Sequence, residues 1–142
     1  MIAYIDSSVL LRIVLRQPSP LEDWDNLTLG VSSRLIAAEC YRAIDQLWHR
    51  GNLTQDDVTE KREIIGTFAK RLDLRELDEH VLDLTSQPLP TPLATLDSIH
   101  LSTAMIYRAT HRDDGKIYFA THDVALAVAA KAMHFHVIGV TV

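Results

Sequence analysis

The chain has 142 residues, of which 47% are hydrophobic and 23% charged, and its formal net charge is −5. This length fits one compact domain with a real core, and the composition excludes a disordered or membrane-spanning chain. No apolar run approaches the ~20 residues that cross a bilayer, and the N-terminus lacks a signal-type segment, so we expect a cytoplasmic protein without a membrane partner. The negative charge argues against a general nucleic-acid coat, although a local basic rim around an acidic pocket remains compatible with it.

Signals for strands and helices alternate along the chain. The expected strands, in chain order, cover residues 2–5, 27–31, 72–77, 116–121 and 137–142. The expected helices cover residues 9–15, a segment from a Ser32 or Ser33 cap to 50, 54–71, 79–86, 93–112 and 124–133. The second and third helices follow each other directly, so we expect an αα-hairpin. Strands separated by helices indicate parallel βαβ units and therefore an α/β fold with a mainly parallel sheet of about five strands. No repeat or low-complexity tract divides residues 1–142, so we expect a single domain.

Four carboxylates stand where such a sheet would bring them together. Asp6 follows the first strand, Asp123 follows the fourth strand, and Glu39 and Asp97 lie early in two helices. Ligands of an open parallel sheet bind at the carboxyl ends of its strands, so we expect one shared pocket. Acids crowded together are tolerated mainly when a cation neutralises them, and oxygen ligands of this kind suit Mg2+ or Mn2+.

Each acid also has a plain structural interpretation. Asp6 or Asp123 alone is more simply an N-cap whose carboxylate accepts a backbone N–H of the next helix. Glu39 is harder to explain in this way, because its segment Leu35-Ile-Ala-Ala-Glu-Cys40 is otherwise apolar. A buried charge is costly without a partner or a metal, and this favours a functional role for Glu39.

Four segments, in this order, carry a resemblance to a known family. They are Tyr4-Ile-Asp-Ser-Ser8, Ala37-Ala-Glu-Cys40, Leu96-Asp-Ser-Ile-His-Leu-Ser-Thr-Ala104 and Ala120-Thr-His-Asp123. The chain resembles the PIN-domain ribonucleases over nearly its whole length, and among them the VapC-like toxins of type II toxin–antitoxin systems. The resemblance implies a three-layer α/β/α PIN-like domain, an RNA substrate that is a structured cellular RNA, and a cognate antitoxin protein.

The resemblance also implies roles for individual residues. Asp6, Glu39, Asp97 and Asp123 would form an acidic quartet that holds one or two Mg2+ or Mn2+ ions, with Glu39 acting as a ligand or orienting a water. Ser7 and Thr121 would support the quartet. A metal ion held there would lower the pKa of a bound water and stabilise charge on the scissile phosphate.

Two histidines and four arginines lie near these acids in sequence or in the expected fold. His100 lies one helical turn after Asp97, and His122 precedes Asp123. Hard cations prefer oxygen, so both histidines are left out of the metal set. We predict that four residues, called the rim arginines below, grip RNA phosphates. They are Arg12, Arg16, Arg34 and Arg42. Taken singly, each has a simpler interpretation as a solvated charge or the partner of an ion pair.

Two other classes of function remain open at this stage. One is a receiver-like Mg2+-dependent signalling module, although Asp6 is followed by two serines and no lysine ends the final strand. The other is a degenerate PIN-like domain that binds RNA or metal without cleaving. We also predict a homodimer, because the stripe Val9-Leu10-Ile13-Val14 and the hairpin around Trp48 suggest more apolar surface than one core needs.

Overall fold

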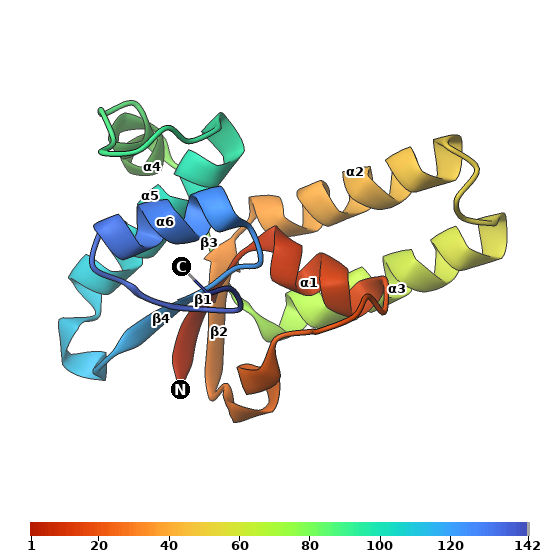
Figure 1. The fold of residues 1–142 in the computed structure, drawn as a ribbon, viewed down its shortest axis with the longest axis horizontal. Coiled ribbons are helices and arrows are strands. Elements are labelled where there is room, and N and C mark those ends of the chain that lie inside the picture. The colour runs from red at the N-terminus through yellow and green to blue at the C-terminus, as the bar shows by residue number, and fades with distance from the viewer. Residues whose placement is uncertain (142) are drawn as a thin grey trace.

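The computed structural model describes residues 1–141 and has a five-stranded sheet at its centre (Figure 1). The strands are β1 (Ile2–Ile5), β2 (Leu29–Ser33), β3 (Asp73–Arg75), β4 (Ile117–Ala120) and β5 (His136–Ile138). Their order in the sheet is β3-β2-β1-β4-β5, and all four pairs of neighbours are parallel. β1 therefore lies at the centre, with the carboxyl ends of β2 and β4 beside its own.

Helices cover both faces of the sheet. They are α1 (Ser7–Val14), α2 (Leu35–His49), α3 (Gln55–Arg71), α4 (Glu79–Thr85), α5 (Thr95–Thr110) and α6 (Val124–Ala132), with short 3-10 turns η1 (Glu22–Asn26) and η2 (Arg112–Asp114). One core cluster joins α1, α2 and α3 to one face, and a second joins α5 and α6 to the other. Figure 1 shows these two layers on opposite sides of the strands, with the α2–α3 hairpin extending beyond the sheet. The predicted three-layer α/β/α fold with a parallel sheet is confirmed.

Local sequence signals explain where several helices begin. At the start of α3, Thr54 and Asp57 form the expected reciprocal capping box, with N–H···O distances of 2.9 and 3.1 Å. At the start of α2, the hydroxyl of Ser33 accepts a hydrogen bond from the backbone N–H of Leu35 at 3.1 Å. Each such bond satisfies an N–H that the first turn of a helix leaves without a partner.

β1 has its expected limits, β3 and β4 are shorter than expected by one or two residues at their ends, and β2 and β5 differ most. β2 lies two residues later than expected, because η1 extends to Asn26 and Leu27 forms its C-cap, with its N–H donating to the carbonyl of Trp24. β5 begins at His136 and ends at Ile138, well before the expected end at Val142, which lies outside the described residues. The chain turns at Gly139, whose φ of +101° favours glycine and where a Cβ atom would collide with the carbonyl of Thr121.

The stripe of α1 does not supply surplus apolar surface. Val9, Leu10 and Val14 are almost fully buried in the core cluster under α2 and α3. Three of the four stripe residues therefore face the molecule's own interior and cannot form a dimer interface, whereas Ile13 is half-buried. Trp48 at the end of α2 is 41% exposed, so the hairpin remains as the basis of the dimer prediction. Within residues 1–141, no helix is both long and apolar enough to cross a membrane.

Candidate acidic active site

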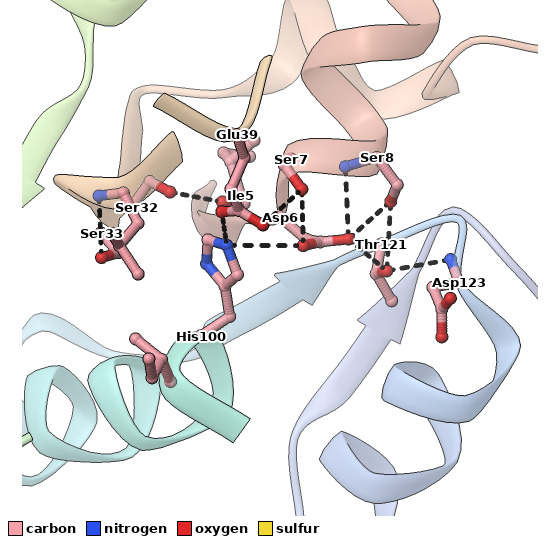
Figure 2. A network of polar contacts seen from close by, with 12 residues as sticks. Ile5, Asp6, Ser7, Ser8, Ser32, Ser33, Glu39, His100, Thr121 and Asp123 are labelled. Carbon is pink, nitrogen blue, oxygen red and sulfur yellow. Dashed lines mark hydrogen bonds and ion pairs between the residues drawn. The ribbon is translucent and has the colours of Figure 1, made fainter. Parts of the chain in front are cut away.

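Asp6 lies at the centre of the carboxyl edge of the sheet, between the end of β1 and the start of α1. It is 2% exposed, and its Oδ2 accepts hydrogen bonds from the hydroxyls of Ser8 (2.6 Å) and Thr121 (2.9 Å) and from the N–H of Ser8 (3.3 Å). Its Oδ1 faces Ser7 Oγ at 3.5 Å and His100 Nε2 at 3.8 Å (Figure 2). One oxygen is thus fixed by the fold, and the other faces the remaining polar side chains.

Glu39 reaches the same place from α2. Its Oε2 accepts from Ser7 Oγ at 3.3 Å, and its Oε1 lies 2.5 Å from Nε2 of His100. The side chain of Glu39 is only 16% exposed, so its charge is held by these partners in a largely dry setting. The prediction that a partner or metal must accompany Glu39 therefore has a physical basis, because a buried carboxylate without partners would be unstable.

Asp97 lies in the first turn of α5, and the charges of the other three acids affect its pKa. Burial, together with the charges of Asp6, Asp123 and Glu39, raises the pKa of Asp97 to about 6, against a smaller opposite effect of His100. Like charges shift a pKa in this way only when they are close. The charges of the other three predicted acids therefore reach Asp97, and the shared site of all four stays a prediction.

Asp123 is the most exposed member of the quartet. It is the N-cap of α6, where its Oδ1 accepts from the N–H of Leu126 at 2.8 Å, and its own N–H donates to Thr121 Oγ1 at 3.0 Å. Figure 2 shows its carboxylate set apart from those of Asp6 and Glu39, on the far side of Thr121. Asp6 is likewise the N-cap of α1, so for both residues the capping role is real and exists beside any other role.

The donor set fits a hard divalent cation in its chemistry. The four acids supply carboxylate oxygens from elements that start or end near one edge of the sheet. The pKa of Asp97 is raised chiefly by burial and further by the charges of Asp6, Asp123 and Glu39, and a cation would offset that negative charge. Within residues 1–141, no three or more His, Cys, Asp or Glu side chains lie close enough together to bind one metal ion as they stand. The quartet thus combines suitable chemistry with side chains more widely spaced than those of a closed coordination shell.

No family model matches the chain. The chain is 33% identical over 138 residues to ribonuclease VapC46 of Mycobacterium tuberculosis, and the alignment covers 95% of each chain. The chain belongs to the VapC ribonuclease family. The resemblance seen in the four sequence segments is therefore confirmed, and membership of the VapC family leaves the receiver-like interpretation without support.

The rim arginines of this VapC-family protein bond to residues outside the quartet. Arg16, Arg34 and Arg42 form exposed ion pairs with neighbouring acids at 3.2, 2.7 and 3.0 Å. Arg12 donates to the carbonyl of Ser19 at 3.1 Å and lines a cavity of about 350 Å3 together with His122. The simpler interpretation as ion-pair partners thus describes three of the four side chains, and RNA binding by all four stays a prediction.

Sequence reasoning missed Ser8 as a participant in the VapC-family site and left the role of His100 open. Ser8 bridges the edge, because its hydroxyl bonds Asp6 and also accepts from the N–H of His122 at 2.9 Å. His100 is fully buried and joins Glu39 to Tyr4, although it was left without a role. Its position one turn after Asp97 was the available signal, since residues three apart share a helix face. His122 instead turns its Nδ1 to the carbonyl of Gly139 at 2.9 Å.

The electrostatic setting of His100 follows from these contacts. Burial by itself lowers the pKa of His100, but the hydrogen bond to Glu39 and the charges of Glu39, Asp6 and Asp97 together raise it above the ordinary value. Burial strongly raises the pKa of Tyr4, so its hydroxyl keeps its proton at neutral pH. Beneath the acidic site, the buried side chains of His100 and Tyr4 are therefore neutral or cationic and can donate hydrogen bonds.

Proposed function

We propose that this protein is a Mg2+- or Mn2+-dependent endoribonuclease and the toxin of a toxin–antitoxin pair. Support comes from its similarity to a VapC ribonuclease over 95% of both chains. The observation that carries the metal dependence is the raised pKa of Asp97, which burial raises most and to which the charges of Asp6, Asp123 and Glu39 add. Oxygen-only sites of this kind favour hard cations over other metals.

The proposed role of each site residue follows from the contacts that orient its side chain. Asp6 offers Oδ1 while Ser8 and Thr121 hold Oδ2, so this carboxylate is oriented before anything binds. Asp97 and Asp123 approach from the starts of α5 and α6, and Glu39 from α2. When bound, the metal supplies a water of lowered pKa and positive charge at the scissile phosphate. The carboxylates bind and orient, and Ser7 bridges Asp6 and Glu39 as their hydroxyl donor.

The proposed substrate is a structured cellular RNA. Specific recognition of RNA mostly targets bases splayed from loops, so selectivity has to arise from the surface around the quartet rather than from the acids themselves. The rim arginines are the proposed phosphate contacts. The cognate antitoxin is proposed to act as the inhibitory partner, and a homodimer through the α2–α3 hairpin is the proposed assembly.

The proposal is tested by incubating the purified protein with folded RNA in the presence of Mg2+ or Mn2+, with EDTA as a control. Wild type is expected to cleave only with metal, and Asp97→Asn is expected to lose at least about 100-fold in rate, as for a metal-site ligand. Asp83→Asn, an exposed acid of α4, is the matched control and is expected to cleave normally. Cleavage by Asp97→Asn at the wild-type rate would contradict the four-acid model.

The same assay distinguishes the proposed enzyme from the remaining alternative, a catalytically inactive domain that binds RNA or metal. Such a domain would bind Mn2+ and retain RNA on a filter without producing fragments under any metal condition. The presence of all four acids and the similarity to a ribonuclease favour the active enzyme.

A further inference from the structure

We propose that His100 is a positioning residue that fixes the orientation of Glu39 in the acidic site, with Tyr4 holding His100 in turn. The inference rests on the proposed function, because it concerns how that site is kept ready for a metal ion. Tyr4, His100 and Glu39 are called the buried network below. They come from β1, α5 and α2, so the network ties the two helical layers together across the carboxyl edge of the sheet.

Burial makes the contacts of His100 obligatory. Tyr4 and His100 are both 0% exposed, so neither side chain has water available as a partner. A buried polar atom that lacks a hydrogen bond is costly, and an imidazole ring has two nitrogens to satisfy. Nε2 lies 2.5 Å from Glu39 Oε1, and Nδ1 lies 2.8 Å from the hydroxyl of Tyr4. The ring therefore has one partner on each side.

The carboxylate partner fixes the proton on Nε2, whereas the Tyr4 hydroxyl can pair with Nδ1 in either charge state of the ring. An ionised carboxylate only accepts hydrogen bonds, so Nε2 must carry a proton that it donates to Glu39. In the neutral ring Nδ1 is then the acceptor, and the protonated hydroxyl of Tyr4 donates to it. A protonated Nε2 has no lone pair for a metal ion. His100 thus acts on the site through Glu39 and does not itself serve as a ligand.

The consequence for Glu39 is that both of its oxygens are held. His100 donates to Oε1 and Ser7 donates to Oε2, from opposite layers of the fold. The same two donors also lie 3.8 and 3.5 Å from Oδ1 of Asp6. His100 and Ser7 therefore stand between two carboxylates that would otherwise repel each other, and they set the spacing of the pair (Figure 2).

A purely structural role for His100 makes a different prediction. The ring also packs edge-on against Tyr4 at a centroid distance of 5.8 Å, and Tyr4 stacks on Phe119 at 5.3 Å. If His100 only filled space, replacing it would lower the stability of the fold and leave the metal affinity of the folded protein unchanged. Metal affinity, and not stability, is therefore the measurement that decides.

The test compares His100→Gln with His100→Asn in the full chain, with Mn2+ binding followed by electron paramagnetic resonance. The two amides differ by one methylene group. The amide nitrogen of Gln comes near the position of Nε2 and can still donate to Glu39, whereas the shorter Asn cannot reach it. His100→Asn is expected to bind Mn2+ about 10–100-fold more weakly than wild type, and His100→Gln within about threefold of it. His80→Gln, at an exposed histidine of α4, is the matched control and is expected to bind as wild type does.

A second pair of measurements shows through which residue His100 acts. In the background of Glu39→Gln, the further change His100→Asn is expected to alter Mn2+ affinity by less than about twofold, since the effects of coupled residues are not additive. Tyr4→Phe leaves the ring in place and removes only the hydroxyl that holds Nδ1, and it is expected to weaken Mn2+ binding by about three- to tenfold. If His100→Asn fails to fold, as judged by circular dichroism, Tyr4→Phe decides in its place.

The metal-free protein supplies an independent readout. The Nε2–H proton of His100 is expected to give a downfield, slowly exchanging NMR signal that shifts in Glu39→Gln. Folded His100→Asn with wild-type Mn2+ affinity, or Tyr4→Phe with unchanged affinity where Asn does not fold, would overturn the role of the network and leave the metal site standing. A wild-type protein that binds no Mn2+ would instead refute the proposed function, and the presence or absence of this NMR signal would then decide on the network.

Discussion

Replacing Asp97 by Asn is expected to stabilise the metal-free protein at neutral pH. The pKa of Asp97 is raised from 3.8 to about 6, chiefly by burial and then by the charges of Asp6 and Asp123. The folded state therefore binds this proton more tightly than the unfolded state does. The favourable contribution of protonated Asp97 to the free energy of unfolding is complete below pH 4 and is lost as the pH rises through 6. At pH 7 the ionised side chain therefore destabilises the fold.

The size of this effect follows from the shift. A displacement of about two pKa units corresponds to about 3 kcal/mol at most. Asp97 is only partly buried, so screening by solvent reduces the expected gain to about 1 kcal/mol. The charge also lies in the first turn of α5, where a helix dipole favours an acid by about 0.3–1 kcal/mol. Because the net pKa shift is upward, burial and repulsion outweigh the dipole.

The assay is urea unfolding in EDTA at pH 7 and at pH 4, with wild type, Asp97→Asn and the exposed-acid control Asp83→Asn. We expect Asp97→Asn to unfold at a higher urea concentration than wild type at pH 7, and to lose this advantage at pH 4, where the wild-type carboxyl is protonated. Asp83→Asn should follow wild type at both values. An equal gain at both pH values would refute the reasoning, because the effect would then not arise from the charge of Asp97.

Three further predictions follow from the contacts of the site and its surroundings. Thr121→Val removes a donor to the buried Oδ2 of Asp6 and is expected to cost about 1–3 kcal/mol in urea unfolding, whereas Thr67→Val on the exposed face of α3 should cost much less. Trp48→Glu is expected to convert a dimer to a monomer in sedimentation at micromolar concentration, and a wild-type protein that is already a monomer would contradict the hairpin interface. Replacing a rim arginine that binds phosphate should lower the salt slope of RNA binding by about one unit and leave Mn2+ affinity unchanged, and an unchanged slope in the fourfold variant would exclude the rim arginines.

Much of the site could be read from the sequence, because its position is set by local patterns. Asp6 and Asp123 each follow a short apolar strand, and those two strands turn out to be parallel neighbours, so their ends meet. Glu39 could be recognised because it is a charged residue within an apolar helical segment. The fold class followed from the same alternation of strands and helices, and the hairpin of α2 and α3 from their adjacency.

What could not be read are the contacts between distant segments. The pairs Ser8 with Thr121 and Tyr4 with His100 are separated by 113 and 96 residues, and no periodicity links them. The ion pairs of the rim arginines are of the same kind, since Arg16 meets Glu60 and Arg34 meets Glu76 only after the helices and strands have packed. Composition indicates that these charges exist, but tertiary packing decides which of them neutralise each other.

Asp6 and Asp123 can each cap a helix and bind a metal ion at the same time, because the cap uses only one of the two carboxylate oxygens. A carboxylate has two, and the cap of α1 uses Oδ2 of Asp6 while the cap of α6 uses Oδ1 of Asp123. Each cap satisfies a helix terminus and at the same time fixes the plane of the carboxylate, which leaves the second oxygen in a defined direction. An acid that follows a strand of a parallel sheet is therefore oriented by the helix that it begins. The structural interpretation of these residues explains how they can serve a metal site and does not compete with it.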